Sequence, residues 1–232
     1  MVNEIVTGDR SAPSVHDVRR RLAALEPLNT PSVRKLRRDY AKQLADAPPG
    51  TVLRFVRSLL DGGAWPERVI AYEVLAGHAG AFRLLDDRAA EAMARNLADW
   101  ASVDLYGVTV LGQAWRAGLV TDARILAWAR SPDRWRRRLA VVATVPLNAR
   151  ARGGTGNTQR TLRVCRALLN DRDDMVVKAM SSSLRELAKR DPAAVELFLK
   201  QEDARLAARV KREVSNKLRT GLKSPRVRRG LS

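Results

Sequence analysis

The chain has 232 residues, enough to bury a substantial core as one elongated domain, and its 43 Lys and Arg against 25 Asp and Glu give a formal net charge of +18. This charge favours a polyanionic partner, with nucleic acid first and an anionic membrane surface second. No apolar run approaches the length that spans a bilayer, and basic residues recur along the whole chain, which weakens the membrane alternative.

The chain has too few cysteines and histidines to form a disulfide or a recognisable metal site. Cys165 is the single cysteine, which excludes an intramolecular disulfide, and His16 and His78 do not form a metal-binding motif. We therefore expect no metal ion and no other cofactor. The first residues lack the apolar core of a signal peptide, so we expect a flexible N-terminus over residues 1–13 and a cytoplasmic, nucleoid-associated protein.

Apolar residues recur at helical spacing almost throughout the chain, as in Val33, Leu36 and Tyr40, and strand-like alternation is absent. Thr30 precedes Pro31 and Ser131 precedes Pro132, which places a capping side chain before a proline at the start of a helix. The pattern predicts an all-α fold with helices over residues 14–27, 31–45, 51–61, 65–78, 87–98, 101–117, 121–130, 132–147, 158–170, 174–190, 192–201 and 204–219.

These helices are short and joined by tight turns, so consecutive helices are expected to pack as antiparallel pairs. The pairs recur roughly every thirty-five to forty residues, which suits a HEAT-like helical-repeat solenoid. We expect a single domain over residues 14–220, with a curved, concave face that forms a long groove. The basic tail over residues 221–232 is either a solvated end or a phosphate contact.

The segment over residues 148–157 is rich in glycine and arginine and indicates an exposed loop. It is not a phosphate-binding P-loop, because no strand precedes it and the Gly-Lys-Ser/Thr ending is missing. Two interpretations remain open: the loop is a flexible connector, or its Arg150 and Arg152 form a basic finger on the DNA backbone.

A carboxylate and a tryptophan share one face of the helix predicted over residues 101–117. Trp100, Asp104, Gly107 and Leu111 fall on one stripe, and no basic residue lies three or four positions from Asp104. This pattern makes Asp104 and Trp100 candidate catalytic residues. The alternative is that Asp104 favours the positive end of the helix dipole and has no further role.

Four arginines within five residues accompany a tryptophan at the start of the next predicted helix pair. Trp135, Leu139 and Val142 predict the buried stripe, which leaves Arg138 on its edge and Arg134 one turn before it. A rigid helix that presents Arg134, Trp135, Arg137 and Arg138 suits phosphate binding. The alternative is a solvated charged face.

Three consecutive serines occupy the helix predicted over residues 174–190, although serine is a poor helix former. The apolar stripe of that helix leaves Ser182 facing away from the core, between Lys178 and Arg185. We therefore count Lys178, Ser182 and Arg185 among the candidate nucleic-acid-binding residues, with a plain solvent-exposed face as the alternative.

Five segments of the chain occur in a recognisable order and spacing. They are Thr30-Pro31-x-x-Arg34-x-Leu36-x-x-Asp39, Trp65-Pro66-Glu67-Arg68, Trp100-x-Ser102-Val103-Asp104, Trp135-x-x-Arg138 and Leu184-Arg185-Glu186-x-Ala188-Lys189. In their order and approximate spacing these segments resemble the DNA alkylation repair family, the AlkD-type HEAT-like-repeat alkylpurine DNA glycosylases, and the resemblance covers roughly residues 15–220.

The resemblance implies a monofunctional enzyme of base excision repair that hydrolyses the N-glycosidic bond of purines alkylated at N3 or N7 in double-stranded DNA, acting as a monomer. It also implies that the lesion stays in the duplex, unlike the base flipping of most base-modifying enzymes. Asp104 matches the family's carboxylate, Trp100 an aromatic that rests against the deoxyribose, and Arg138 a residue that holds a nearby phosphate. A carboxylate stabilises developing positive charge more strongly in a groove that excludes water than in water.

The chain departs from the family pattern at Ser182, where the family carries a second tryptophan that cradles the lesion. The smaller side chain either widens the cleft for bulky adducts, as in relatives that give producers of DNA-alkylating antibiotics self-resistance, or accompanies a loss of activity. The competing hypotheses are a noncatalytic HEAT-repeat protein that binds damaged or branched DNA, and a scaffold for acidic proteins. Base release from alkylated DNA distinguishes the enzyme from both.

Overall fold

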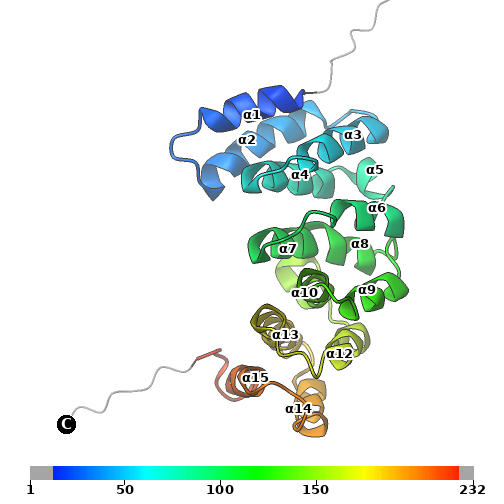
Figure 1. Ribbon diagram of the computed structural model, residues 1–232, viewed down its shortest axis with the longest axis vertical. Helices are drawn as coiled ribbons and strands as arrows, with labels where there is room; N and C mark the ends of the chain where they lie inside the picture. Colours follow the sequence, from blue (N-terminus) through cyan, green and yellow to red (C-terminus); the bar gives the residue numbers. More distant parts are fainter. Residues whose placement is uncertain (1–12, 225–232) are drawn as a thin grey trace, which may run out of the picture. The chain divides into compact units, whose positions relative to one another are not determined.

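The computed structural model describes residues 13–224, and Figure 1 shows these residues as helices joined by short turns. No strand occurs within this range, which confirms the all-α prediction. Residues 1–12 of the expected flexible N-terminus and residues 225–232 of the basic tail, with Arg226, Arg228 and Arg229, lie outside the described residues.

The described residues form two compact units, one ending at Leu84 and the other starting at Leu85. The first unit contains α1 (Val15–Ala23), α2 (Thr30–Gln43), α3 (Pro49–Leu60), α4 (Trp65–Gly77) and α5 (Ala79–Phe82). Helix α4 packs against both α2 and α3. The predicted stripe of Val33, Leu36 and Tyr40 is buried on α2, and a capping box formed by Asn29 and Ser32 closes the N-terminus of this helix.

The second unit begins with α6 (Asp87–Met93), α7 (Trp100–Tyr106), the π-helical segment η1 (Gly107–Leu111), α8 (Gly112–Arg116) and α9 (Asp122–Ala129). It continues with α10 (Arg134–Val142), α11 (Val145–Asn148), the 3₁₀ turn η2 (Arg150–Arg152), α12 (Thr158–Ala167), α13 (Asp174–Leu187), α14 (Pro192–Gln201) and α15 (Ala208–Thr220).

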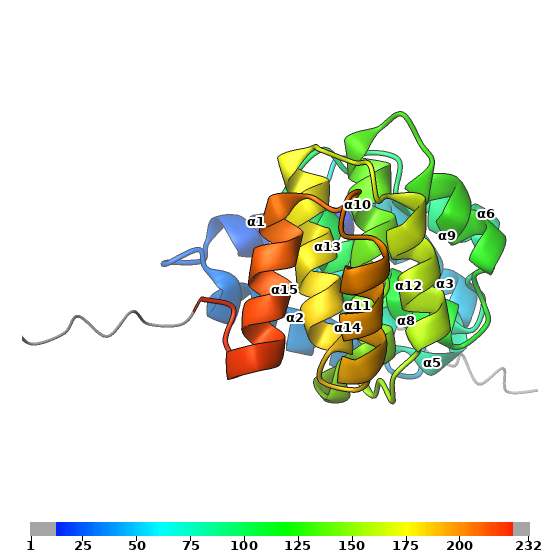
Figure 2. The same cartoon turned by 90° about the horizontal axis from the view of Figure 1, so that it is seen from below.

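Helices of the second unit stack in two layers. Helix α10 packs against α7 and α13, and α13 packs against α15, so these four form one layer. Figure 2 shows α10, α13 and α15 side by side. The other layer contains α9, α12 and α14, which pack behind α10, α13 and α15. This stacking of helix pairs is the helical-repeat architecture that the sequence predicts.

Two of the predicted helices are interrupted. The helix expected over residues 132–147 ends at Val142 and a separate helix starts at Val145, with Pro146 in its first turn. A proline inside a continuous helix would clash with the carbonyl of Val142 four residues earlier, so the chain breaks before it. The helix expected over residues 101–117 contains the π-helical turn of η1 between α7 and α8.

Two glycines allow the segment from α7 to α8 to lie close against α10 and α11. A Cβ atom at Gly107 would lie 2.7 Å from Cγ1 of Val142, and one at Gly112 would overlap the carbonyl oxygen of Ala143. Both distances are much shorter than an ordinary van der Waals contact. Gly107 therefore allows the start of η1 to approach α10 closely, and Gly112 allows α8 to approach the start of α11.

We predict that Gly112→Ala lowers the free energy of unfolding by about 1–3 kcal/mol, the usual cost of overpacking, because the added methyl group meets backbone that cannot rotate away. Urea unfolding followed by circular dichroism measures the change. Gly77→Ala is the matched control, because a Cβ atom at that helical position meets nothing within 4 Å. Equal stability of the two variants would contradict the close approach.

Candidate functional site

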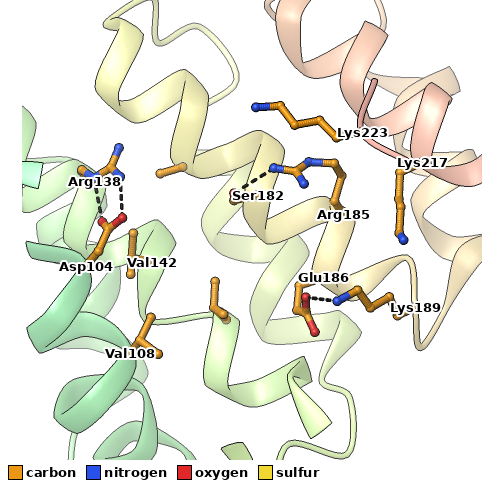
Figure 3. Close-up of a pocket in the computed structure, with 12 residues that line it drawn as sticks. Asp104, Val108, Arg138, Val142, Ser182, Arg185, Glu186, Lys189, Lys217 and Lys223 are labelled. Carbon is orange, nitrogen blue, oxygen red and sulfur yellow. Dashed lines mark hydrogen bonds and ion pairs between the residues drawn. The ribbon is translucent and has the colours of Figure 1, made fainter. Parts of the chain in front are cut away.

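A cavity of about 360 Å³ opens between the helices of one layer of the second unit. Asp104, Val108, Arg138 and Val142 line it on the side of α7, η1 and α10, and Ser182 and Arg185 line it on the side of α13. Figure 3 shows these two walls facing each other. The remaining residues at its surface are Val145, Ala179, Glu186, Lys189, Lys217 and Lys223.

The wall on the side of α7 and α10 is organised by a bidentate ion pair between Asp104 and Arg138. Nε of Arg138 donates to Oδ1 of Asp104 at 2.8 Å, and an NH2 group donates to Oδ2 at 2.6 Å. The third guanidinium nitrogen donates to the carbonyl oxygen of Met175 at the start of α13. Parallel hydrogen bonds of this kind fix both the position and the plane of a carboxylate.

Arg138 lies in the core and not on the edge of the buried stripe, where the sequence placed it. Its exposed fraction is 6 %, whereas Trp135, expected in the stripe, is half-buried. Leu139 and Val142 are buried as expected. The reason is the partner: a guanidinium is tolerated in a helix interface when a carboxylate and a carbonyl satisfy it.

Burial raises the pKa of Asp104 above its ordinary value of 3.8, and the charge of nearby Asp99 raises it further. The hydrogen bonds and the positive charge of Arg138 oppose this rise. The side chain of Asp104 is 34 % exposed and lines the cavity, so a ligand in the cavity can reach its carboxylate. The guanidinium of Arg138, which binds this carboxylate, is buried.

Trp100 is 58 % exposed at the start of α7, one helical turn before Asp104. The N-terminus of this helix is capped by Asp99, whose side chain accepts from the backbone N–H of Ser102 at 2.8 Å. Asp104 lies beyond the first turn of α7, and the effect of the helix dipole on a carboxylate is strongest within that turn, so the helix-dipole interpretation of Asp104 is weakened. The exposed side chain of Trp100 does not line the cavity.

The other arginines of the 134–138 cluster have separate partners. Arg137 pairs with Asp171 at 2.7 Å and donates to the carbonyl oxygens of Ser131 and Pro132, so it ties the end of one helix pair to the next. Arg134 is exposed, stacks over Trp135 with 4.8 Å between the guanidinium carbon and the ring centre, and reaches Asp173 at 3.8 Å.

The three serines of α13 divide between two roles. Ser181 and Ser183 are fully buried: the hydroxyl of Ser181 donates to Glu213 of α15 at 2.6 Å, and that of Ser183 bonds the hydroxyl of Thr144. Ser182 is exposed and lines the cavity, where its hydroxyl accepts from an NH2 group of Arg185 at 2.9 Å. The expectation that Ser182 faces away from the core is confirmed.

The remaining candidate nucleic-acid-binding residues, Lys178, Arg150 and Arg152, do not line this cavity. Lys178 pairs with Asp174 at 2.6 Å one turn away on α13. Arg150 and Arg152 are exposed in η2.

The loop that carries Arg150 and Arg152 is anchored. The guanidinium of Arg190 donates to the carbonyl oxygens of Asn148 and Gly154 at 2.8 Å each, and Arg116 donates to that of Arg152 at 2.7 Å. The role of its two arginines stays a prediction.

Sequence reasoning missed the residues that complete the wall opposite Asp104, namely Glu186, Lys189, Lys217 and Lys223. Lys189 follows Ser182 and Arg185 at helical spacing, so the pattern on α13 contained a signal for it. Lys217 and Lys223 reach the cavity because α15 packs on α13, and no local pattern indicates that contact.

Within residues 13–224 no three His, Cys, Asp or Glu side chains gather as metal ligands would. None of the helices described is both long enough and apolar enough to cross a membrane.

A comparison with curated protein sequences found no match. A comparison with protein families found that residues 26–218, most of the chain and all of the cavity except Lys223, match the model described as DNA alkylation repair enzyme. This chain therefore belongs to the DNA alkylation repair enzyme family.

Proposed function

We propose that the protein is a DNA glycosylase that hydrolyses the bond between deoxyribose and a purine alkylated at N3 or N7 in duplex DNA. The observation that carries the proposal is the half-buried carboxylate of Asp104, fixed by a buried arginine at the edge of a cavity and one helical turn from an exposed tryptophan. Membership of the repair family supplies DNA as the substrate.

The chemistry suits this arrangement. An alkylated purine carries positive charge, so it leaves with the electron pair of the glycosidic bond as a neutral base. The sugar is left with positive charge at C1′ and its ring oxygen, which a fixed carboxylate stabilises strongly in a site shielded from water. Water then adds to C1′ and loses a proton, which completes the hydrolysis. In this scheme Asp104 stabilises the sugar cation, and Trp100 supports the deoxyribose.

We assign Arg138 to positioning Asp104, in place of the phosphate contact that the family resemblance implied. Three of its nitrogens already donate to Asp104 and Met175. Phosphate contacts fall instead to more exposed cations, with Arg134, Arg185 and the loop arginines as candidates.

The cavity also bears on the class of adduct. Ser182 stands where the family carries a tryptophan, and it borders a space of about 360 Å³ that a large aromatic side chain would reduce. We propose that the enzyme accepts bulky adducts without flipping the base from the duplex, in general repair or in self-resistance to a genotoxic natural product. Trp100, Asp104 and Arg138 are all retained, which favours activity over its loss.

One observation favours the noncatalytic alternative. In the ion pair between Asp104 and Arg138, both carboxylate oxygens accept hydrogen bonds from the guanidinium. The pair also joins α7, α10 and α13, as a purely structural pair would. A protein that binds damaged DNA without hydrolysing it would have the same fold and charge, so base release decides between the two.

We predict that Asp104→Asn lowers the rate of base release by about 10²–10³-fold, the usual effect of removing one electrostatic group from such a site. Binding to undamaged duplex persists, because the cationic side chains are unchanged. Mass spectrometry of bases released from methylated duplex and from duplex carrying a bulky adduct measures the rate. Asp203→Asn, an exposed carboxylate outside the cavity, is the matched control. Unchanged release by Asp104→Asn would exclude its catalytic role.

We predict that base release falls as the pH is lowered through the pKa of Asp104, which lies above 3.8, because the ionised carboxylate is the active form. In Arg138→Gln the two effects that lower this pKa disappear while burial remains, so activity is lost at a higher pH than in the wild type. Single-turnover rates over a pH series, corrected for spontaneous depurination, locate the two midpoints. A midpoint that stays in place or moves down would refute this role of the ion pair.

A further inference from the structure

We propose that the wall of the cavity opposite Asp104 is a phosphate-binding subsite for the DNA backbone, built by Arg185 of α13 and Lys217 of α15 and oriented by the buried carboxylate of Glu213. The inference deepens the proposed function, since it assigns the groups that set which nucleotide faces Asp104. We call the four cations of this wall, Arg185, Lys189, Lys217 and Lys223, the cationic wall.

The members of the cationic wall differ in how far they are neutralised. Lys189 pairs with Glu186 at 2.5 Å, and Lys223 pairs with Glu213 at 3.5 Å. Among the residues that the structure describes, it gives Arg185 and Lys217 no carboxylate partner. Nζ of Lys217 donates to the carbonyl oxygen of Gly221, and Arg185 donates to serine hydroxyls. Two positive charges on the cavity thus remain available to an anion.

Arg185 is held in place by a chain of hydrogen bonds that ends on a buried acid. Glu213 is 6 % exposed and accepts from the hydroxyl of Ser181 at 2.6 Å. The oxygen of Ser181 accepts from Nε of Arg185 at 3.3 Å, and Ser182 accepts from its NH2 group at 2.9 Å. A guanidinium has five N–H donors; these bonds take two, which leaves three for a ligand.

The position of the cationic wall selects the backbone over the base as its ligand. An alkylated purine carries positive charge, and two unneutralised cations would repel it. A phosphodiester has the opposite charge and offers two oxygens to an oriented guanidinium. Figure 3 shows Arg185, Lys217 and Lys223 across the cavity from Asp104. A phosphate bound there places the adjoining deoxyribose between the two walls, with its C1′ toward the carboxylate.

The subsite also explains why three serines follow one another in α13. Ser181 and Ser183 fasten the helix to its neighbours through buried hydrogen bonds, and Ser182 supports Arg185 at the surface. Together Ser181 and Ser182 hold the guanidinium along the helix and prevent it from extending into solvent.

The first test measures the salt dependence of binding to undamaged duplex for the wild type, Arg185→Gln and Lys217→Gln. Each lost phosphate contact makes the slope of log K against log salt concentration shallower by about 0.9. Lys200→Gln is the matched control, an exposed lysine of α14 outside this cavity, and its slope is expected to equal that of the wild type. Slopes of Arg185→Gln and Lys217→Gln equal to that of the control would overturn the subsite.

The second test asks whether Ser181 acts through Arg185. We expect Ser181→Ala to weaken duplex binding in the wild-type background and to have no further effect in the Arg185→Gln background. A merely structural role would weaken binding equally in both backgrounds, and that result would overturn the positioning assignment. Thermal unfolding of each variant shows whether the helix contact itself is lost.

The outcomes separate this inference from the proposed function. A wild type that releases alkylated bases while the variant slopes stay unchanged overturns the subsite and leaves the glycosylase standing. Shallower slopes in a protein that releases no base support the subsite and overturn the glycosylase.

Discussion

The ion pair between Asp104 and Arg138 is the interaction on which the rest of the site depends. It joins α7 to α10, and the same guanidinium reaches the backbone of α13 at Met175, so one side chain connects three consecutive helices of a layer. Removing one partner of such a pair is costly, because the other is left buried without compensation. The close approach at Gly107 and Gly112 keeps the segments from α7 to α11 near enough for the pair to form.

Helix α13 extends this arrangement across the cavity. On one side it packs against α10 and the turn that follows α10, where Met175 accepts from Arg138 and Ser183 bonds Thr144. On the other side it packs against α15 through Ser181 and Glu213. The cavity therefore has a fixed carboxylate on one wall and oriented cations on the other. In the proposed glycosylase these opposite charges act on one nucleotide, with the carboxylate facing the sugar and the cations facing its phosphate.

Local patterns in the sequence predicted the helices but not the contacts between them. The apolar stripe of α13 at Val177, Met180, Leu184 and Leu187 is buried as its spacing indicates. The helix expected over residues 132–147 was wrong at Pro146, although the proline itself was a signal, because a proline inside a helix clashes with the carbonyl four positions earlier. No local pattern indicated the π-helical turn at Gly107–Leu111, where Gly107 lies close against Val142 of α10.

In the candidate site, too, local patterns indicated the residues but not their contacts across helices. Asp104 looked unpaired because its arginine lies 34 residues away, and Arg138 looked peripheral because Trp135, Leu139 and Val142 were expected to form the buried stripe. Both errors come from judging a charge by its neighbours in the sequence. Lys217 and Lys223 belong to the site through the packing of α15 on α13. The single domain expected over residues 14–220 stays a prediction.

The central claim is that Arg138 acts through Asp104, and a double-mutant cycle on the rate of base release tests it most directly. Single-turnover rates are measured for the wild type, Asp104→Asn, Arg138→Gln and the double variant, with enzyme saturating. If the two residues act as one unit, the double variant is no slower than Asp104→Asn. If the two losses multiply, Arg138 contributes independently of Asp104, as a direct phosphate contact would, and its assignment as a positioning residue is contradicted.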